Sequence, residues 1–341
     1  MNSQHDDVIA VDAVVPAEVS ELDKQQRREK IYTRAIEGHF QRLRLYTGWP
    51  LLLGYFLLPW LMYGNRQAVL FDLPARKFHI FSLTFWPQDL VLLAFILIIA
   101  AFTLFAVTAI WGRLWCGYTC PQTVWTAIFM YIEQRFEGSR SQRIKLDQES
   151  MSWKKLRRKT LKHSGWALVA AFTGITFISY FVPIRQLLPD LLSLTANTSA
   201  ASFALLFSVA TYLNAGYLRE KVCTDMCPYA RFQSVMFDKN TLVVTYDTKR
   251  GEPRGSRKRF AIKEAHQGDC VDCELCVQVC PTGIDIRAGL QYECIGCALC
   301  IDACDSIMEK MGSPKGLVSY TSENALTGNE IYHYLKEAIE T

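Results

Sequence analysis

The sequence predicts a membrane protein in which four transmembrane helices are joined to a cytoplasmic α+β domain. Half of the 341 residues are hydrophobic, and they gather in four apolar runs, whereas the start of the chain and everything after about Lys221 are polar and charged. All twelve cysteines fall in spaced motifs that follow these runs. The formal net charge of +4 lies beside the apolar runs, which indicates contact with membrane lipids and no nucleic-acid binding.

The N-terminal part is polar and changes character once. Residues Met1–Asp23 are acidic, and this composition predicts disorder. The next segment, Lys24–Arg44, is basic and carries apolar residues at helical spacing: Ile31, Ala35, Ile36, Phe40 and Leu43. We therefore expect residues 24–44 to form an amphipathic helix on the membrane surface.

The membrane domain is predicted to cover residues 45–230. Its four expected spans are Leu45 to about Tyr63, Leu90–Ile110, Trp166–Val182 and Ala200–Tyr217. The second span contains no charged residue, and Trp111 and Trp115 follow it where interfacial aromatic residues are common. A further apolar segment, Val124–Ile132, is too short to cross a bilayer and is expected at the interface.

Charge in the connecting loops predicts the orientation. The segment Arg113–Lys162 is rich in lysine and arginine, so the positive-inside rule places it in the cytoplasm. The loop between the third and fourth spans has Arg185 as its only basic residue and is expected outside. A chain that starts inside and crosses four times ends inside, so the C-terminal domain is expected in the cytoplasm.

The motif Cys-x-x-x-Cys-Pro occurs twice, each time after a pair of predicted spans. Its cysteines are Cys116 and Cys120 in the first copy, and Cys223 and Cys227 in the second. This organisation suggests an internal duplication whose halves bring the four thiols together. Cysteines at i and i+4 share one helix face, and soft thiolates favour Cu(I), zinc or iron–sulfur centres. We interpret the four cysteines as one catalytic metal site; the alternative is inert, packed cysteines.

Two further cysteine runs have the form Cys-x-x-Cys-x-x-Cys-x-x-x-Cys, which is typical of bacterial ferredoxins with two clusters. In that arrangement one [4Fe–4S] cluster is bound by Cys270, Cys273, Cys276 and Cys304, and the other by Cys280, Cys294, Cys297 and Cys300. Pro281 follows the first run as the pattern expects, whereas Asp305 replaces the proline after the second. Structural zinc gives no role to the third cysteine of each run, and disulfides need an oxidising compartment.

These runs define a predicted two-cluster ferredoxin-like domain at residues 231–320. The residues Leu242–Tyr246 have the composition of a strand that enters this domain. The segment Arg250–Arg259 is a basic linker suited to anionic lipid headgroups. Residues 321–341 form a polar stretch with helical character.

Several stretches together resemble the FixG/RdxA family of cytochrome c oxidase accessory proteins, also called CcoG. They are Cys116-Gly-Tyr-Thr-Cys120-Pro-Gln-Thr, Cys223-Thr-Asp-Met-Cys227-Pro-Tyr-Ala-Arg-Phe-Gln, Arg250-Gly-Glu-Pro-Arg-Gly and the double ferredoxin run. The resemblance extends from about Tyr32 to Tyr320. Related membrane ferredoxins share the cysteine motifs but not the residues between them.

The resemblance implies a multi-pass protein of the bacterial inner membrane that reduces Cu(II) to Cu(I) during assembly of a cbb3-type oxidase. It implies copper ions, oxidase assembly factors, copper-delivery proteins and a cytoplasmic or quinol electron donor as partners. Family members usually continue through a further span into an extracytoplasmic immunoglobulin-like domain, which this sequence, ending at Thr341, is expected to lack. Two other functions stay open: a quinol-linked electron relay for periplasmic respiratory enzymes, and a non-catalytic factor that holds copper.

Overall fold

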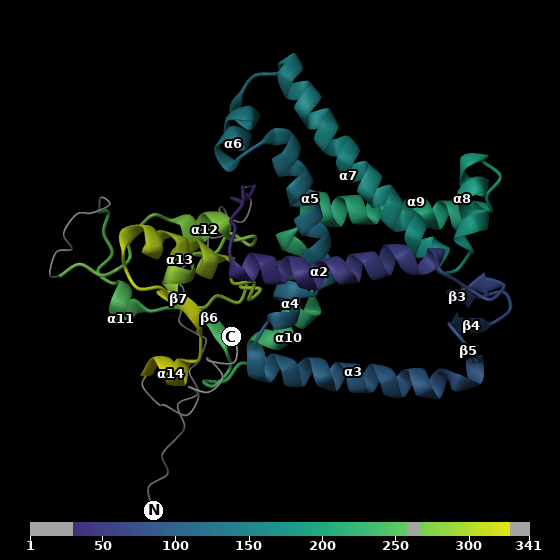
Figure 1. Cartoon of the computed structure of the whole chain (residues 1–341), viewed down its shortest axis with the longest axis horizontal. Helices are drawn as coiled ribbons and strands as arrows, with labels where there is room; N and C mark the ends of the chain where they lie inside the picture. The colour runs from purple at the N-terminus through teal and green to yellow at the C-terminus, as the bar shows by residue number, and fades with distance from the viewer. Residues whose placement is uncertain (1–29, 258–265, 328–341) are drawn as a thin grey trace, which may run out of the picture. The chain divides into compact units, whose positions relative to one another are not determined.

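The computed structural model describes residues 30–257 and 266–327 (Figure 1). The chain divides into two units, Met1–Tyr32 and Thr33–Thr341. In the first unit only residues 30–32 are described, and they form neither helix nor strand. The predicted disorder of residues 1–23, the start of the predicted helix at 24–29 and the end of the chain at 328–341 lie outside the described residues.

The predicted amphipathic helix at 24–44 is wrong for residues 30–37, which are not helical. Within the second unit, this stretch packs along the ferredoxin-like domain. The amide of Arg34 donates to the carbonyl of Gln278 at 2.8 Å, and Ile36 packs against that domain's apolar core. Tertiary contacts therefore override the helical spacing of its apolar residues.

Helix α2, His39–Leu57, begins where this segment ends. The carboxylate of Asp302, which belongs to the ferredoxin-like domain, accepts hydrogen bonds from the amides of Phe40 and Gln41 at 3.1 and 2.8 Å. Gly38 leaves room for this contact, because a Cβ there would lie 2.2 Å from Asp302 Cγ. An acidic side chain at a helix N-terminus satisfies free amides, so Asp302 explains the start of α2.

Each of the four predicted spans overlaps a helix of the structure. The helices are α2, α3 (Leu90–Trp111), α7 (Trp153–Ser179) and α9 (Thr198–Leu213), which continues as the π-helix η3 (Asn214–Leu218). The stretches Pro87–Trp111 and Thr198–Leu218 are long and apolar enough to cross a bilayer, which indicates a membrane protein. In α3 only Thr108 is buried, as expected for a helix that faces lipid.

The first predicted span ends earlier than expected, because α2 is followed by the 3-10 helix η1 (Leu58–Trp60) and then by strands. These strands are β1 (Met62–Tyr63), β2 (Arg66–Gln67), β3 (Val69–Asp72), β4 (Lys77–Ile80) and β5 (Leu83–Phe85). They form two antiparallel sheets, β1-β2 and β3-β4-β5, and η2 (Pro87–Asp89) leads into α3. Gln67 connects strand β2 to the last turn of the third predicted span, since its side-chain amide donates a hydrogen bond to the carbonyl oxygen of Ser179 at 2.8 Å.

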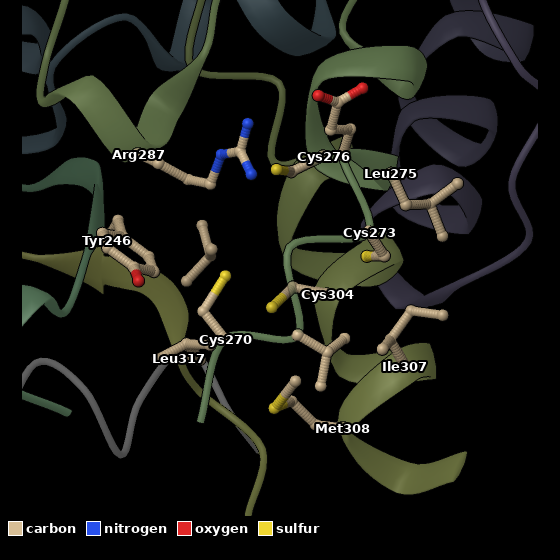
Figure 2. A pocket seen from close by; sticks show the side chains of 13 residues that line it. Tyr246, Cys270, Cys273, Leu275, Cys276, Arg287, Cys304, Ile307, Met308 and Leu317 are labelled. Carbon is tan, nitrogen blue, oxygen red and sulfur yellow. The ribbon is translucent and has the colours of Figure 1, made fainter. Parts of the chain in front are cut away.

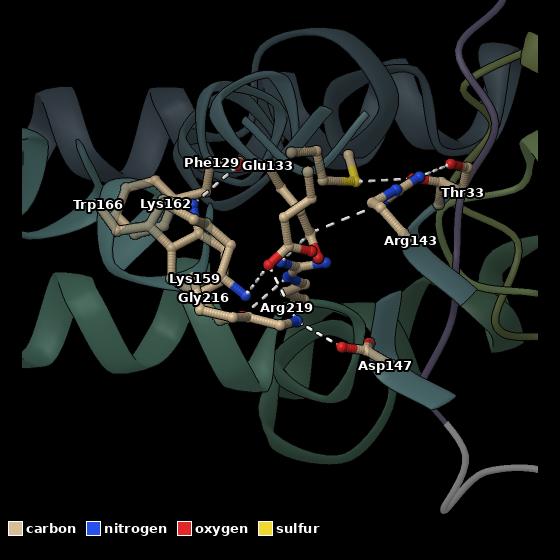
Figure 3. A network of polar contacts seen from close by, with 12 residues as sticks. Thr33, Phe129, Glu133, Arg143, Asp147, Lys159, Lys162, Trp166, Gly216 and Arg219 are labelled. Carbon is tan, nitrogen blue, oxygen red and sulfur yellow. Dashed lines mark hydrogen bonds and ion pairs between the residues drawn. The ribbon is translucent and has the colours of Figure 1, made fainter. Parts of the chain in front are cut away.

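The segment between the second and third spans is helical: α4 (Leu114–Tyr118), α5 (Pro121–Glu137) and α6 (Arg140–Gln148). The apolar segment 124–132 is therefore part of a longer helix. Buried ion pairs join α5 to its neighbours (Figure 3). Glu133 pairs with Arg219 at 2.6 Å and Arg143 at 3.6 Å, and Glu137 pairs with Lys162 at 2.9 Å. Both carboxylates are fully buried.

The remaining elements lie in the second part of the membrane domain and in the ferredoxin-like domain. Helix α8 (Ile184–Leu192) connects α7 to α9, and the π-helix η4 (Val222–Met226) and α10 (Pro228–Met236) follow η3. The ferredoxin-like domain contains β6 (Val243–Tyr246), α11 (Thr248–Gly251), α12 (Leu275–Val279), η5 (Ile286–Ala288), α13 (Leu299–Met311), β7 (Val318–Thr321) and α14 (Glu323–Thr327). The predicted strand at 242–246 is confirmed as β6, which pairs antiparallel with β7.

Candidate functional site

Four thiols of the ferredoxin-like domain line one cavity, here called the first cluster cavity. They belong to Cys270, Cys273, Cys276 and Cys304, the set that the spacing assigns to one cluster. Figure 2 shows them around a common space, with Arg287 and Met308 also on the lining. The donor set and the apolar wall suit a [4Fe–4S] cluster.

The other four thiols line a second cavity, here called the second cluster cavity. They belong to Cys280, Cys294, Cys297 and Cys300, and Cys276 lines both cavities. The structure thus brings together each set that the crossed pattern predicts, while the bonds to iron remain a prediction. Cys276 therefore forms a wall that the two cavities share.

The two cysteine runs turn in the same way. In each run the residues on both sides of the middle cysteine have positive φ angles: Asp272 and Glu274 at 51° and 53°, and Gly296 and Ala298 at 65° and 58°. A short helix follows in both cases, α12 or α13. Such strained positions concentrate at ligand-binding sites, and here they turn three thiols toward one cavity.

Burial controls the protonation of these thiols. It raises the pKa of Cys276 to about 11 and those of Cys294 and Cys304 to about 12. It also raises the pKa of Cys300 well above its ordinary value. A buried thiol becomes a thiolate only beside positive charge, so cluster binding must release protons from these side chains.

The two Cys-x-x-x-Cys-Pro motifs have the same local structure. Four residues before the first cysteine the chain breaks at a positive φ angle, 58° at Gly112 and 38° at Arg219. At the second cysteine the amide donates to a carbonyl five residues earlier, at 2.9 Å for Cys120 and 2.8 Å for Cys227. The following proline then opens a new helix, α5 or α10, a position that suits a residue without an N–H. This likeness supports an internal duplication.

The expectation that each cysteine pair shares one face of one helix is wrong. Cys116 lies in α4 and Cys223 in η4, whereas Cys120 and Cys227 each immediately precede the next helix. The reason is the proline after each second cysteine, which cannot continue the hydrogen-bond ladder of the earlier helix. Each pair therefore spans a break between two helices.

The four cysteines of the two halves nevertheless lie close together, and we call them the membrane thiolate site. Burial, together with neighbouring Cys120, Cys223 and Cys227, raises the pKa of Cys116 to about 12. Burial and then Cys120 and Cys227 raise the pKa of Cys223 to about 11. Among the described residues no three Cys, His, Asp or Glu side chains meet the geometry of a single-ion site, so these thiols must adjust to hold one.

The membrane thiolate site lies directly against the second cluster cavity. Cys116 and Cys223 pack on the buried apolar group that contains Ile295 and Cys297. The backbone contact is so close that a Cβ on Gly117 would lie 2.8 Å from the carbonyl oxygen of Gly296 and 3.0 Å from Cys297 Cα. Sequence reasoning missed Gly117, although a glycine next to a motif cysteine is a signal of close approach.

Two polar side chains near the site were also missed, because no spacing pattern marks them. Gln233 in α10 is fully buried and accepts a hydrogen bond from Cys116 Sγ at 3.3 Å through Oε1. It thereby joins the second half of the chain to a cysteine of the first. Arg113 is also buried, and its guanidinium donates to the carbonyls of Tyr292, Cys294 and Ala230.

Comparisons with known proteins agree with this chemistry. A family model described as "4Fe-4S dicluster domain" matches residues 218–323, and one described as "4Fe-4S binding domain" matches residues 93–137. The chain therefore contains two ferredoxin-type iron–sulfur domains, consistent with two [4Fe–4S] clusters. The second match contains Cys116 and Cys120 as its only cysteines. No solved structure matches the chain significantly.

Curated relatives decide the family. The chain is 43% identical over 310 residues to the nitrogen fixation protein FixG of Rhizobium meliloti, which covers 89% of this chain. It is 41% and 40% identical to the proteins RdxA and RdxB of Cereibacter sphaeroides, each over 86% of this chain. The chain belongs to the FixG/RdxA family. It spans 59%, 62% and 63% of the length of these FixG and Rdx relatives. The predicted family is thus confirmed, and an iron–sulfur electron-transfer role follows for the part that this chain covers.

Proposed function

We propose that this FixG/RdxA-family protein is a cupric reductase of the bacterial inner membrane that serves assembly of a cbb3-type oxidase. Electrons pass from the two cluster cavities to the membrane thiolate site, where one electron converts Cu(II) to Cu(I). The observation that carries the proposal is the contact of Gly117 with Gly296 and Cys297, which puts the two redox sites against each other.

The residues of the membrane thiolate site suit this reaction. Thiolates are soft ligands that prefer Cu(I) to Cu(II), so four cysteines favour the reduced ion and draw the reduction forward. Cys116 and Cys223 are half-buried, which limits the access of water to the site, and Gln233 orients Cys116 through its hydrogen bond. Copper is the substrate here, and the clusters supply single electrons.

The proposed topology is multi-pass, with the ferredoxin-like domain in the cytoplasm. Helices α3 and α9 with η3 supply two crossings, and α2 and α7 supply two more. The first turn of α7 is basic, with Lys154 and Lys155, which favours the cytoplasmic side. Because the segment around Gly117 touches the ferredoxin-like domain, both lie on that same side. The proposed partners are copper-delivery proteins, oxidase assembly factors and a cytoplasmic or quinol electron donor.

The proposal is tested by removing the cysteine pairs separately and together. We expect Cys116→Ala/Cys120→Ala, Cys223→Ala/Cys227→Ala and the quadruple variant to lose Cu(II) reduction to nearly the same extent, because groups that act as a unit are strongly non-additive. Cu(I) is trapped with a chromogenic chelator in dithionite-reduced protein, with cluster absorbance as the control. Additive losses, or parent-rate reduction by the quadruple variant, would place copper reduction elsewhere.

A further inference from the structure

Arg113 connects the three segments that build the two redox sites. It precedes Cys116 by three residues, and only 5% of its surface is exposed. One nitrogen, Nη1, donates to the carbonyls of Tyr292 and, at 3.3 Å, Cys294, which lines the second cluster cavity. The other, Nη2, donates to the carbonyl of Ala230 in the first turn of α10. A single guanidinium thus joins both halves of the membrane thiolate site to a cluster-binding loop.

No carboxylate among the described residues forms an ion pair with Arg113, although Glu293 of the neighbouring loop lies near enough to favour its charged form. None of the ion pairs formed among those residues includes Arg113, and its Nε atom has no hydrogen-bond partner in that part of the chain. Burying a cation that has no ion-pair partner is unfavourable, because the cation gives up its hydration. Burial accordingly lowers the pKa of Arg113, while Cys116, Cys294, Cys223 and Glu293 act in the opposite direction.

The thiols around Arg113 can supply the missing negative charge once they are ligands. Four thiolates bring four negative charges to a site, and a bound cluster or copper ion neutralises only part of them. The sites on both sides of Arg113 are then anionic, and each becomes more so when it accepts an electron. A cation between them stabilises the reduced state of either site.

We propose that Arg113 is a positioning residue for electron transfer, a shared counter-ion that holds the Tyr292–Cys294 loop against the Cys116 turn and raises the reduction potential of the second cluster. For the identity of the electron acceptor this inference rests on the proposed function. For the potential of the cluster it rests only on the position of Arg113 beside Cys294. In the test, dithionite supplies the electron to the clusters. Each Cu(II) that is reduced to Cu(I) then takes one electron from them.

The test compares Arg113→Gln and Arg113→Lys in the full 341-residue chain, purified without oxygen. In an effective dielectric of about 20, a unit charge roughly 10 Å from a redox site changes a one-electron equilibrium by about tenfold. We therefore expect Arg113→Gln to disfavour reduction of the second cluster about tenfold, which lowers its midpoint potential by about 59 mV. Arg113→Lys keeps the charge and should restore most of the shift. Redox titration followed by EPR measures both midpoints.

Arg287→Gln is the matched control, because Arg287 lines the first cluster cavity and pairs with Asp285 at 2.7 Å. It should change the midpoint of the first cluster and leave the second unchanged. The inference is overturned if Arg113→Gln leaves the second midpoint unchanged, if both midpoints move equally, or if lysine does not restore it. It also fails if both Arg113 variants lose iron, since the role is then only structural. If the shift is found but the unsubstituted chain reduces no Cu(II), the proposed function fails and the inference stands.

Discussion

Adding a methyl group at Gly117 should loosen the contact between the two redox sites. A Cβ there lies 2.8 Å from the oxygen of Gly296, so the two backbones must separate by about 0.6 Å to reach the 3.4 Å of an ordinary contact. Neither neighbouring atom belongs to a flexible side chain. Gly117 lies in α4 without a positive φ angle, so alanine adds no backbone strain there and the effect is purely steric.

Overpacking of this kind costs about 1–3 kcal/mol, and we expect Gly117→Ala to weaken the docking of the cluster loop by this amount. That range corresponds to roughly 5- to 150-fold faster amide hydrogen exchange in residues 292–300, measured by mass spectrometry. Cu(I) formation should slow while iron content stays unchanged, and Gly117→Leu should slow it further. Gly54→Ala is the control, because no atom lies within 4 Å of its added Cβ. Equal exchange and equal copper reduction in Gly117→Ala and Gly54→Ala would refute the role of this contact.

Three other predictions test the clusters, the topology and the ion-pair network. Cys273→Ser and Cys297→Ser should each lower the iron content from about eight per chain by roughly half, and two intact cubic clusters in either variant would contradict the crossed ligation. A reporter fused at Gln142–Met151 or Arg257 should be cytoplasmic and one at Ser193 periplasmic; inverted signals would place the clusters outside. Glu133→Gln leaves Arg219 and Arg143 without their carboxylate and should destabilise the fold by about 3–5 kcal/mol in thermal or denaturant unfolding. Glu309→Gln, whose pair with Lys315 is exposed, should change stability by about 1 kcal/mol or less, and equal effects would show that the buried network is dispensable.

Local spacing predicted the parts of the molecule whose chemistry is local. The cysteine runs place their thiols in two cavities because three cysteines two residues apart, with positive φ angles around the middle one, can only turn inward together. Strand β6 and the long apolar helix α3 likewise follow from composition and periodicity.

Contacts between distant segments were not predictable from such patterns. The apolar residues of segment 30–37 have helical spacing, yet the helix begins only after this segment. Asp302, more than 260 residues away, accepts hydrogen bonds from the amides that begin α2. The strands between η1 and η2 were not predicted, because their short apolar stretches are held by contacts such as Gln67 with Ser179. Arg113 and Gln233 carry no motif, and their roles depend on neighbours that only the tertiary structure brings to them.

The two copies of the Cys-x-x-x-Cys-Pro motif are alike in backbone and differ in side chains. The backbone break, the hydrogen bond over five residues and the Cys-Pro helix start are the same in both copies. The residue after the first cysteine differs: Gly117 in the first copy touches the cluster loop, whereas the second copy has Thr224. Three residues before the first cysteine of the motif, the first copy has Arg113 and the second copy has Glu220, so the charge at this position is reversed. The first copy therefore combines the close approach to the cluster loop with a positive charge, which makes it the entry for electrons under the proposed function, while the second copy completes the thiolate site.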